Sequence, residues 1–153
     1  MSKRYDFWAM YDQDIFVDRV MHHPKITIGH VRVLGTFMKE MDREGEVNLR
    51  FDRIAELSGV SLSSVIRAVK RFESWNWIVR KGKPHQNAKF MVNPELVWKG
   101  KIDERVQLEK DYQTLVQENT LKRKERSHRK NVDSLEKFDI ITEETNPGVH
   151  QCA

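Results

Sequence analysis

Cysteine is almost absent from this chain: among 153 residues Cys152 is the only one, and it lies next to the C-terminus. Because there is no second thiol, no internal disulfide can form, and a reducing compartment is expected. No apolar run approaches the ~20 residues that a membrane-spanning helix needs. The charged start, Met-Ser-Lys-Arg-Tyr-Asp, lacks the apolar core of a signal peptide. We therefore expect a soluble, cytoplasmic protein without a membrane partner.

The usual signatures of enzymes and cofactors are missing as well. The sequence holds no glycine-rich nucleotide-binding loop, and no Ser-His-Asp or Cys-His arrangement can be argued. One group resembles a metal site, His22 and His23 with Asp12, Asp14 and Asp18, but its spacing fixes no common helical face. We expect no metal, no cofactor and no enzymatic activity. The enzyme alternative, a metal-dependent nuclease, would lose its activity on chelation.

Helical periodicity dominates, strands are few and short, and the length suits one domain with an appendage. The predicted fold is mainly α with a small β-ribbon, followed by a C-terminal helix and a disordered tail. Its parts are an aromatic and acidic segment (1–24) that packs on the domain or on a second copy, a domain of helices and a ribbon (25–100), a charged helix (101–131) and the tail (132–153).

Two short helices are predicted between residues 51 and 74. Asp52 can N-cap the first, and Gly59 supplies the left-handed stop that favours its end. Ser61 can N-cap the second. The apolar residues of the second helix recur at four-then-three spacing and share a buried face: Val65, Val69 and Phe72.

The opposite face of the second helix carries hydroxyls near its start and cations further along. A helix lodged in a major groove needs this order, because its N-terminal residues meet base edges while flanking cations meet phosphates. We expect Arg67 to read a guanine, a contact worth ~1–3 kcal/mol of discrimination; a plain solvated face is the alternative. The candidate DNA-binding residues of this helix are Ser61, Leu62, Ser63, Ser64, Arg67, Lys70 and Arg71.

A β-hairpin is predicted directly after the second helix. Asn76 stands where glycine is commonest, since asparagine tolerates the left-handed conformation of a helix C-cap. Strands at 78–79 and 90–92 flank a segment of turn formers and cations. Two helices joined by a tight turn and followed by a hairpin predict a winged helix-turn-helix DNA-binding domain over 25–100. We interpret the hairpin as its DNA-binding wing, with an ordinary exposed hairpin as the alternative. Its candidate contacts are Arg80, Lys81, Lys83, His85 and Lys89.

Positive charge is concentrated in this part of the chain. Residues 67–101 hold nine Lys/Arg against two acids, net +7, whereas the whole chain is only +4. A cationic region confined to one helix and its hairpin is typical of a protein with a polyanionic partner.

The flanking segments give further expectations. A helix over 29–41 completes a trihelical core, 47–49 forms a small strand, and Asn93 caps a turn that begins with Pro94. Trp77 and Trp98 are expected in the core, while Trp75 packs on the surface or stacks on a base of melted DNA. The seam Leu108, Tyr112, Leu115 and Asn119 either docks on the domain or forms a short coiled coil in a homodimer. The basic run 122–130 either adds nonspecific DNA affinity or is solvated.

The order of these motifs resembles the RepL-type plasmid replication proteins, a winged-helix family. The resemblance covers about 27–100 and is carried by Ile-Ala-Glu-Leu-Ser-Gly-Val-Ser, Val-x-Arg-Ala-x-Lys-Arg-Phe, Trp-Ile-Val-Arg-Lys-Gly and, most tellingly, the ending from Asn93 to Gly100. It implies sequence-specific binding of double-stranded DNA at a plasmid origin, with host replication proteins as further partners. The alternatives are a transcriptional repressor and, from another class, a protein-interaction winged helix, whose recognition face would be apolar.

Overall fold

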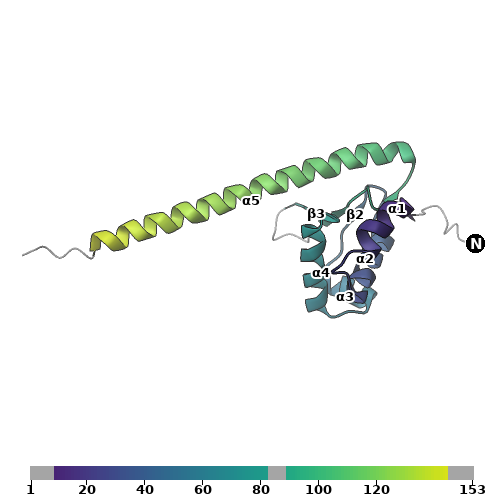
Figure 1. Ribbon diagram of the computed structural model, residues 1–153, viewed down its shortest axis with the longest axis horizontal. Coiled ribbons are helices and arrows are strands. Elements are labelled where there is room, and N and C mark those ends of the chain that lie inside the picture. The colour runs from purple at the N-terminus through teal and green to yellow at the C-terminus, as the bar shows by residue number, and fades with distance from the viewer. Residues whose placement is uncertain (1–8, 83–88, 145–153) are drawn as a thin grey trace, which may run out of the picture. The chain divides into compact units, whose positions relative to one another are not determined.

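The computed structural model describes residues 9–82 and 89–144, and the chain divides into two compact units, 1–116 and 117–153 (Figure 1). Among the described residues no helix is long and apolar enough to cross a membrane. The elements in chain order are β1 (Ala9–Met10), α1 (Gln13–Phe16), η1 (Val17–Met21), α2 (Ile28–Glu40), β2 (Glu46–Val47), α3 (Phe51–Ser58), α4 (Leu62–Ser74), β3 (Ile78–Lys81), β4 (Lys89–Val92), β5 (Trp98–Lys99) and α5 (Ile102–Glu144).

Helices α2, α3 and α4 pack into the predicted trihelical core. α2 lies within one residue of its expected bounds at each end, and Thr27 caps it. The Thr27 hydroxyl accepts from the backbone N–H of His30, and His30 Nδ1 accepts from the N–H of Thr27. The side chains that fill the space between the three helices are fully or almost fully buried: Val33, Leu34, Phe37, Ile54, Val65, Val69 and Phe72.

Helix α3 begins earlier than predicted. Arg50 occupies the N-cap position without a side-chain cap bond, and Asp52 lies inside the first turn, where its Oδ1 accepts from Arg53 N. The predicted cap at Asp52 is therefore wrong. Phe51 stacks on Phe90 of the sheet, at 6.1 Å between ring centroids, and this packing draws Phe51 into the helix. The predicted stop is confirmed, since Gly59 has φ 69°.

Three short antiparallel strands in the order β2-β4-β3 form the sheet of the domain. Val79 lies opposite Met91, and Arg80 opposite Phe90. β3 and β4 are the predicted wing hairpin, and β2 pairs with the far edge of β4. Asn76, with φ 59°, makes the left-handed turn that takes the chain from α4 into β3, as predicted.

The N-terminal segment packs on the domain and contains both a strand and helical turns. β1 pairs antiparallel with β5, a two-stranded sheet that joins residues 90 positions apart, such as Ala9 and Lys99. α1 and η1 follow, and Val20 is buried in the core, with Ile15 and Phe16 packed against it. The sequence left strand and helix open here because the pairing partner lies at the other end of the domain.

The segment after the wing closes the domain. Asn93 Oδ1 accepts from Glu95 N at 2.9 Å, which caps the predicted turn, and Asn93 Nδ2 donates to the Asn76 carbonyl at 2.9 Å. Trp77 and Trp98 are both buried, as expected.

Lys99 has a structural role that its charge does not suggest. The side chain is buried, and Nζ donates to the carbonyl oxygens of Lys39, at 2.9 Å, and Met41, at 2.6 Å. The amine therefore satisfies carbonyls that the C-terminus of α2 leaves unpaired. Burial lowers the pKa of Lys99 from its ordinary value. Lys99, counted above within the positive region, is thus removed from the surface field.

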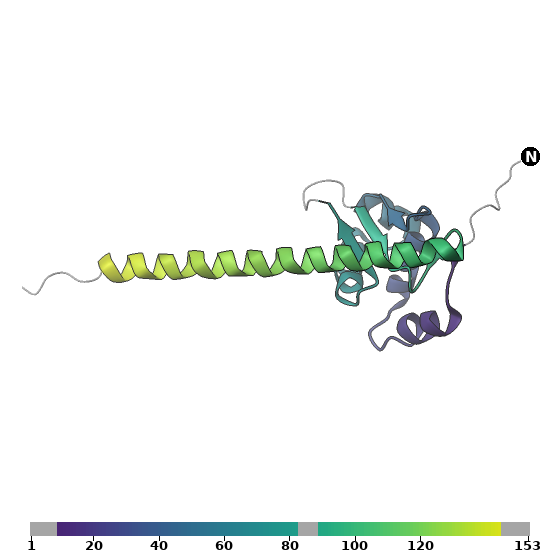
Figure 2. The same ribbon diagram turned by 90° about the horizontal axis from the view of Figure 1, so that it is seen from above.

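Helix α5 docks its first turns on the sheet. Tyr112 is fully buried against Val79 and Met91, with Leu108 and Leu115 packed beside it, and Figure 2 shows this part of the helix lying over the strands. The Tyr112 hydroxyl lies 3.0 Å from the Asn76 carbonyl oxygen and 3.1 Å from Asn76 Oδ1. Leu108, Tyr112 and Leu115 of the predicted seam thus dock on the domain, while the homodimer stays a prediction.

α5 continues to Glu144, which corrects the helix end predicted at residue 131. The expectation of a tail from 132 rested on the lack of an apolar period. Residues 132–144, however, contain neither glycine nor proline, and their Leu, Glu and Lys have high helix propensity. Residues 145–153, the rest of the predicted tail, lie outside the described residues.

Candidate nucleic-acid interface

Helix α4 presents two chemically different faces. Ser61 caps it, with Oγ accepting from Ser64 N at 3.3 Å. The inner face is buried through Val65, Ala68, Val69 and Phe72. The outer side chains are exposed and include the predicted Ser61, Leu62, Ser63, Arg67, Lys70 and Arg71, with Ser64 half-buried.

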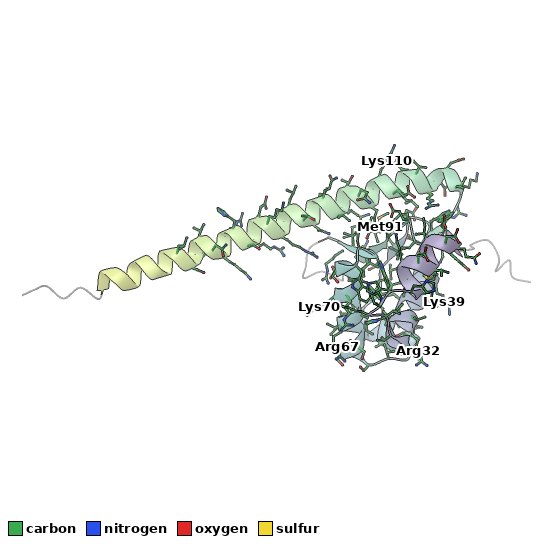
Figure 3. All side chains as sticks on the ribbon, in the orientation of Figure 1. Arg32, Lys39, Arg67, Lys70, Met91 and Lys110 are labelled. Atoms are coloured by element: carbon green, nitrogen blue, oxygen red, sulfur yellow. The ribbon has the colours of Figure 1, made fainter. Side chains whose placement is uncertain are left out.

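The first turn of α4 is a cluster of hydroxyls with an arginine folded over it. Ser61 Oγ lies 3.1 Å from Ser63 Oγ and 2.8 Å from Ser64 Oγ. Arg67 donates to the Ser63 carbonyl and to Ser64 Oγ, each at 3.4 Å, and it stands with Lys70 on α4 in Figure 3. Bonds of this length are weak. The guanidinium is therefore held near the helix start yet free to exchange these contacts for those of a ligand.

A hollow of about 210 Å³ lies where α4 passes the start of α2. Arg67 and Arg71 contribute to its lining, together with the capping pair Thr27 and His30. Two guanidinium groups and a helix N-terminus all favour a negative charge there. The geometry suits a phosphate oxygen. The sequence did not predict this hollow, because its lining comes from two helices whose packing no local pattern fixes. The cap of α2 was missed as well, since Thr-x-x-His differs from the Thr-x-x-Glu/Gln pattern by which a capping box is recognised.

His30 is the buried titratable group beside this hollow. Its side chain is 7 % exposed, packs edge-on to Phe72 and Trp75, and accepts the Thr27 N–H through Nδ1. Burial lowers the pKa of His30 from its ordinary value, and the positive charge of Arg71 lowers it further. The neutral imidazole with Nδ1 unprotonated is the form that completes the cap, because Nδ1 then accepts from the Thr27 N–H.

This lowered pKa predicts a pH dependence of stability. As the pH falls through about 6.5, the unfolded chain gains a proton at His30 that the folded protein does not, so the free energy of unfolding decreases until the folded pKa is reached. In His30→Gln this contribution disappears, because glutamine keeps the capping box and does not titrate. Urea unfolding between about pH 5 and 7.5 measures the difference. Parallel losses in both proteins would assign the effect to the other histidines.

The predicted wing residues differ in their solvent exposure and in their contacts with other side chains. Lys81 pairs with Glu46 and is nonetheless exposed, and Lys89, opposite it in the hairpin, is exposed as well. Arg80 is half-buried, with Nε 3.3 Å from Glu73 Oε1 and its guanidinium 5.1 Å above the Phe90 ring. Arg80 thus links β3 to α4. The prediction that it contacts DNA is therefore withdrawn. Lys83 and His85 lie outside the described residues.

The aromatic and histidine side chains near α4 are packed together. The rings of His23 and Trp75 lie 3.9 Å apart, and Trp75 also contacts Trp77 at 4.8 Å, which is the surface packing expected for Trp75. His22 Nδ1 lies 3.6 Å from Asp18 Oδ1. In the part of the chain that the structure describes, no three His, Cys, Asp or Glu side chains gather closely enough to hold a metal ion.

A trihelical core whose last two helices form a helix-turn-helix, followed directly by a β-hairpin, defines a winged helix-turn-helix protein. The family model of the Firmicute plasmid replication protein (RepL) matches residues 25–142, and the chain belongs to this family. The resemblance drawn from the motifs is thereby confirmed, and it extends into α5. Family and fold together support the binding of double-stranded DNA.

Other comparisons add little. No curated protein matches the chain. One solved structure that matches is a mutant of Lactococcus lactis ZitR, at 17 % identity, with 80 % of this chain and 77 % of that chain covered and a TM-score of 0.27. Superposition this poor carries no argument, so the fold assignment stands on the element order and sheet topology of this chain.

Proposed function

We propose that this protein binds a specific duplex sequence at a plasmid origin and thereby initiates or controls replication, without catalysing a reaction itself. The observation that carries the proposal is the outer face of α4, where exposed hydroxyls precede exposed cations. A protein-interaction winged helix would need an apolar face at this place, and Leu62 is the one large apolar side chain that α4 exposes among the described residues.

Base recognition is assigned to the first turns of α4. Ser63 and Ser64 can accept from or donate to base edges, and Leu62, 47 % exposed, can contact a thymine methyl group. Arg67 presents the planar fork that matches the two acceptors of guanine. These side chains surround the helix start, which is the part of a recognition helix that enters the major groove.

Phosphate contacts are assigned to the cations around that helix start. Lys70 and Arg71 follow on α4, and Arg71 lines the hollow beside α2, where its guanidinium can donate to a phosphate oxygen. On the wing, Lys81 and Lys89 are proposed to contact the DNA backbone or the minor groove. Lys83 and His85 are further candidates from the sequence.

Replacing Arg67 by alanine is expected to cost about 1–3 kcal/mol of discrimination between the preferred duplex and a scrambled one. The probe is a duplex enriched from a random-sequence pool by the full-length protein, and binding is measured by fluorescence anisotropy at fixed salt. Lys39→Ala, which removes an equal charge at the far end of α2, is the matched control and should leave both affinities unchanged. An equal loss on both duplexes would demote Arg67 to a phosphate contact.

Initiation and repression share the same binding chemistry and are separated by a functional assay. Footprinting on the DNA that flanks the gene locates the site, and the same DNA is tested for autonomous replication in the presence of the protein. We expect a footprint and replication that Arg67→Ala abolishes. A footprint over a promoter, without replication, would identify a repressor instead.

A further inference from the structure

The second half of α5 carries a cluster of exposed cations that the winged helix does not explain. Between 117 and 144 the chain holds seven Lys/Arg and seven Asp/Glu, so this segment is neutral in total. Six of the seven cations nevertheless fall between 122 and 130, where Glu125 is the single acid. A solvated helix would intersperse the two signs, whereas blocks of like charge are typical of interaction surfaces.

Helix geometry gathers five of these cations on one side. At 100° per residue they span about 120° of the helix circumference and about 12 Å of its length. The five, which we call the basic face, are Lys122, Arg123, Arg126, Arg129 and Lys130. Lys124 lies on the opposite side.

The basic face is solvent-exposed and little neutralised. Every residue from 121 to 130 is exposed. Lys122 lies 3.7 Å from Glu118 Oε2, and no ion pair between another residue of the basic face and a described side chain is found. Holding five cations this close is unfavourable unless an anion of similar charge density lies against them.

We propose that the basic face is a second DNA-contact surface, which binds the phosphates of duplex DNA without reading their sequence. The proposal rests on the proposed function, since it assumes that duplex DNA is the partner. The duplex carries one negative charge per ~1.7 Å of axis, a density comparable to the five cations of the basic face over ~12 Å of helix. The winged helix selects the site, and the basic face adds affinity that depends on salt.

An anionic membrane surface is the partner that this helix fits less well. Helices that lie in a membrane interface bury a broad apolar face rich in Trp, Phe and Leu. Opposite the basic face stand Leu121, Val132 and Leu135, but Lys124 and His128 interrupt them. Three apolar side chains over four turns are too few for such insertion, so the charge pattern favours DNA.

The test compares two triple variants of the full-length protein. Lys122→Gln, Arg126→Gln and Arg129→Gln together remove three charges from the basic face, while Lys39→Gln, Lys101→Gln and Lys110→Gln remove three exposed charges elsewhere. Glutamine is a good helix former, and circular dichroism verifies that helix content is unchanged. Affinity is measured against salt concentration for the enriched duplex and for its scrambled version.

The basic-face variant is expected to lower the slope of log affinity against log salt by about 2.7, which is ~0.9 for each lost phosphate contact. The affinity loss should be the same factor on both duplexes, and the control variant should retain the wild-type slope. An unchanged slope would overturn the proposal, and so would a loss confined to the enriched duplex, because the face would then read sequence.

Two further outcomes distinguish this proposal from the proposed function and from membrane binding. If wild-type protein fails to prefer the enriched duplex, the proposed function falls, whereas the slope difference still decides the basic face. Sedimentation with phosphatidylserine-containing vesicles tests binding to an anionic membrane surface. Vesicle binding that the basic-face variant loses, with an unchanged slope on DNA, would assign the face to a membrane and overturn the DNA proposal.

Discussion

Tyr112→Ala is expected to lower the free energy of unfolding by about 3–5 kcal/mol, the cost of removing a large aromatic side chain from a core. Tyr112 is fully buried and is the central contact between α5 and the face of the sheet formed by Val79 and Met91. Removing it leaves a cavity there and takes away the partner of Asn76. Urea unfolding monitored by tryptophan fluorescence measures the loss.

Tyr112→Phe is the matched control for that experiment, because it keeps the ring and removes the hydroxyl alone. The expected loss is about 0.5–1.5 kcal/mol, the net value of one hydrogen bond. Burial raises the pKa of the Tyr112 phenol, so the hydroxyl stays a donor at every pH at which the protein is handled. A loss below about 1 kcal/mol in Tyr112→Ala, well under the cost of a core cavity, would show that α5 does not dock on the sheet in solution.

Lys99→Met is expected to lower the free energy of unfolding by about 1.5–3 kcal/mol, the range for hydrogen bonds that involve a charged group. Methionine has a similar length and fills the space, but it leaves the carbonyls of Lys39 and Met41 at the end of α2 without their donor. Lys101→Met, an exposed position two residues further on, should change stability by less than about 0.5 kcal/mol. Equal losses of stability in Lys99→Met and Lys101→Met would contradict the role of Lys99 in capping the C-terminus of α2.

Local patterns made the helix-turn-helix predictable. Ser61 as a cap, the four-then-three spacing through Val65 and Phe72, and the left-handed residues Gly59 and Asn76 all depend on neighbours within a few positions of the chain. Such features can be predicted from the sequence alone, because no contact with a distant residue is needed to form them. The exposure of the outer face of α4 followed from them, because this face lies opposite the buried stripe of the helix.

Contacts between separate helices and strands could not be predicted from local patterns in the sequence. The pairing of β1 with β5, the Arg80–Glu73 ion pair and the burial of Lys99 each depend on how separate elements meet. Two of these cations were counted as part of a surface field and are used inside the domain instead. The end of α5 was missed for another reason, since helix propensity alone sustains it where no apolar stripe exists.

The peptide carbonyl of Asn76 is where three parts of the domain converge. It lies at the turn from α4 into β3, and it accepts from Asn93 after the wing and lies within hydrogen-bond distance of the Tyr112 hydroxyl of α5. These bonds fix the turn that joins α4 to β3, the first strand of the wing hairpin. Preorganisation of this kind lowers the entropic cost of association, so substitutions at Asn93 or Tyr112, neither of which is a proposed DNA contact, should weaken the proposed DNA binding.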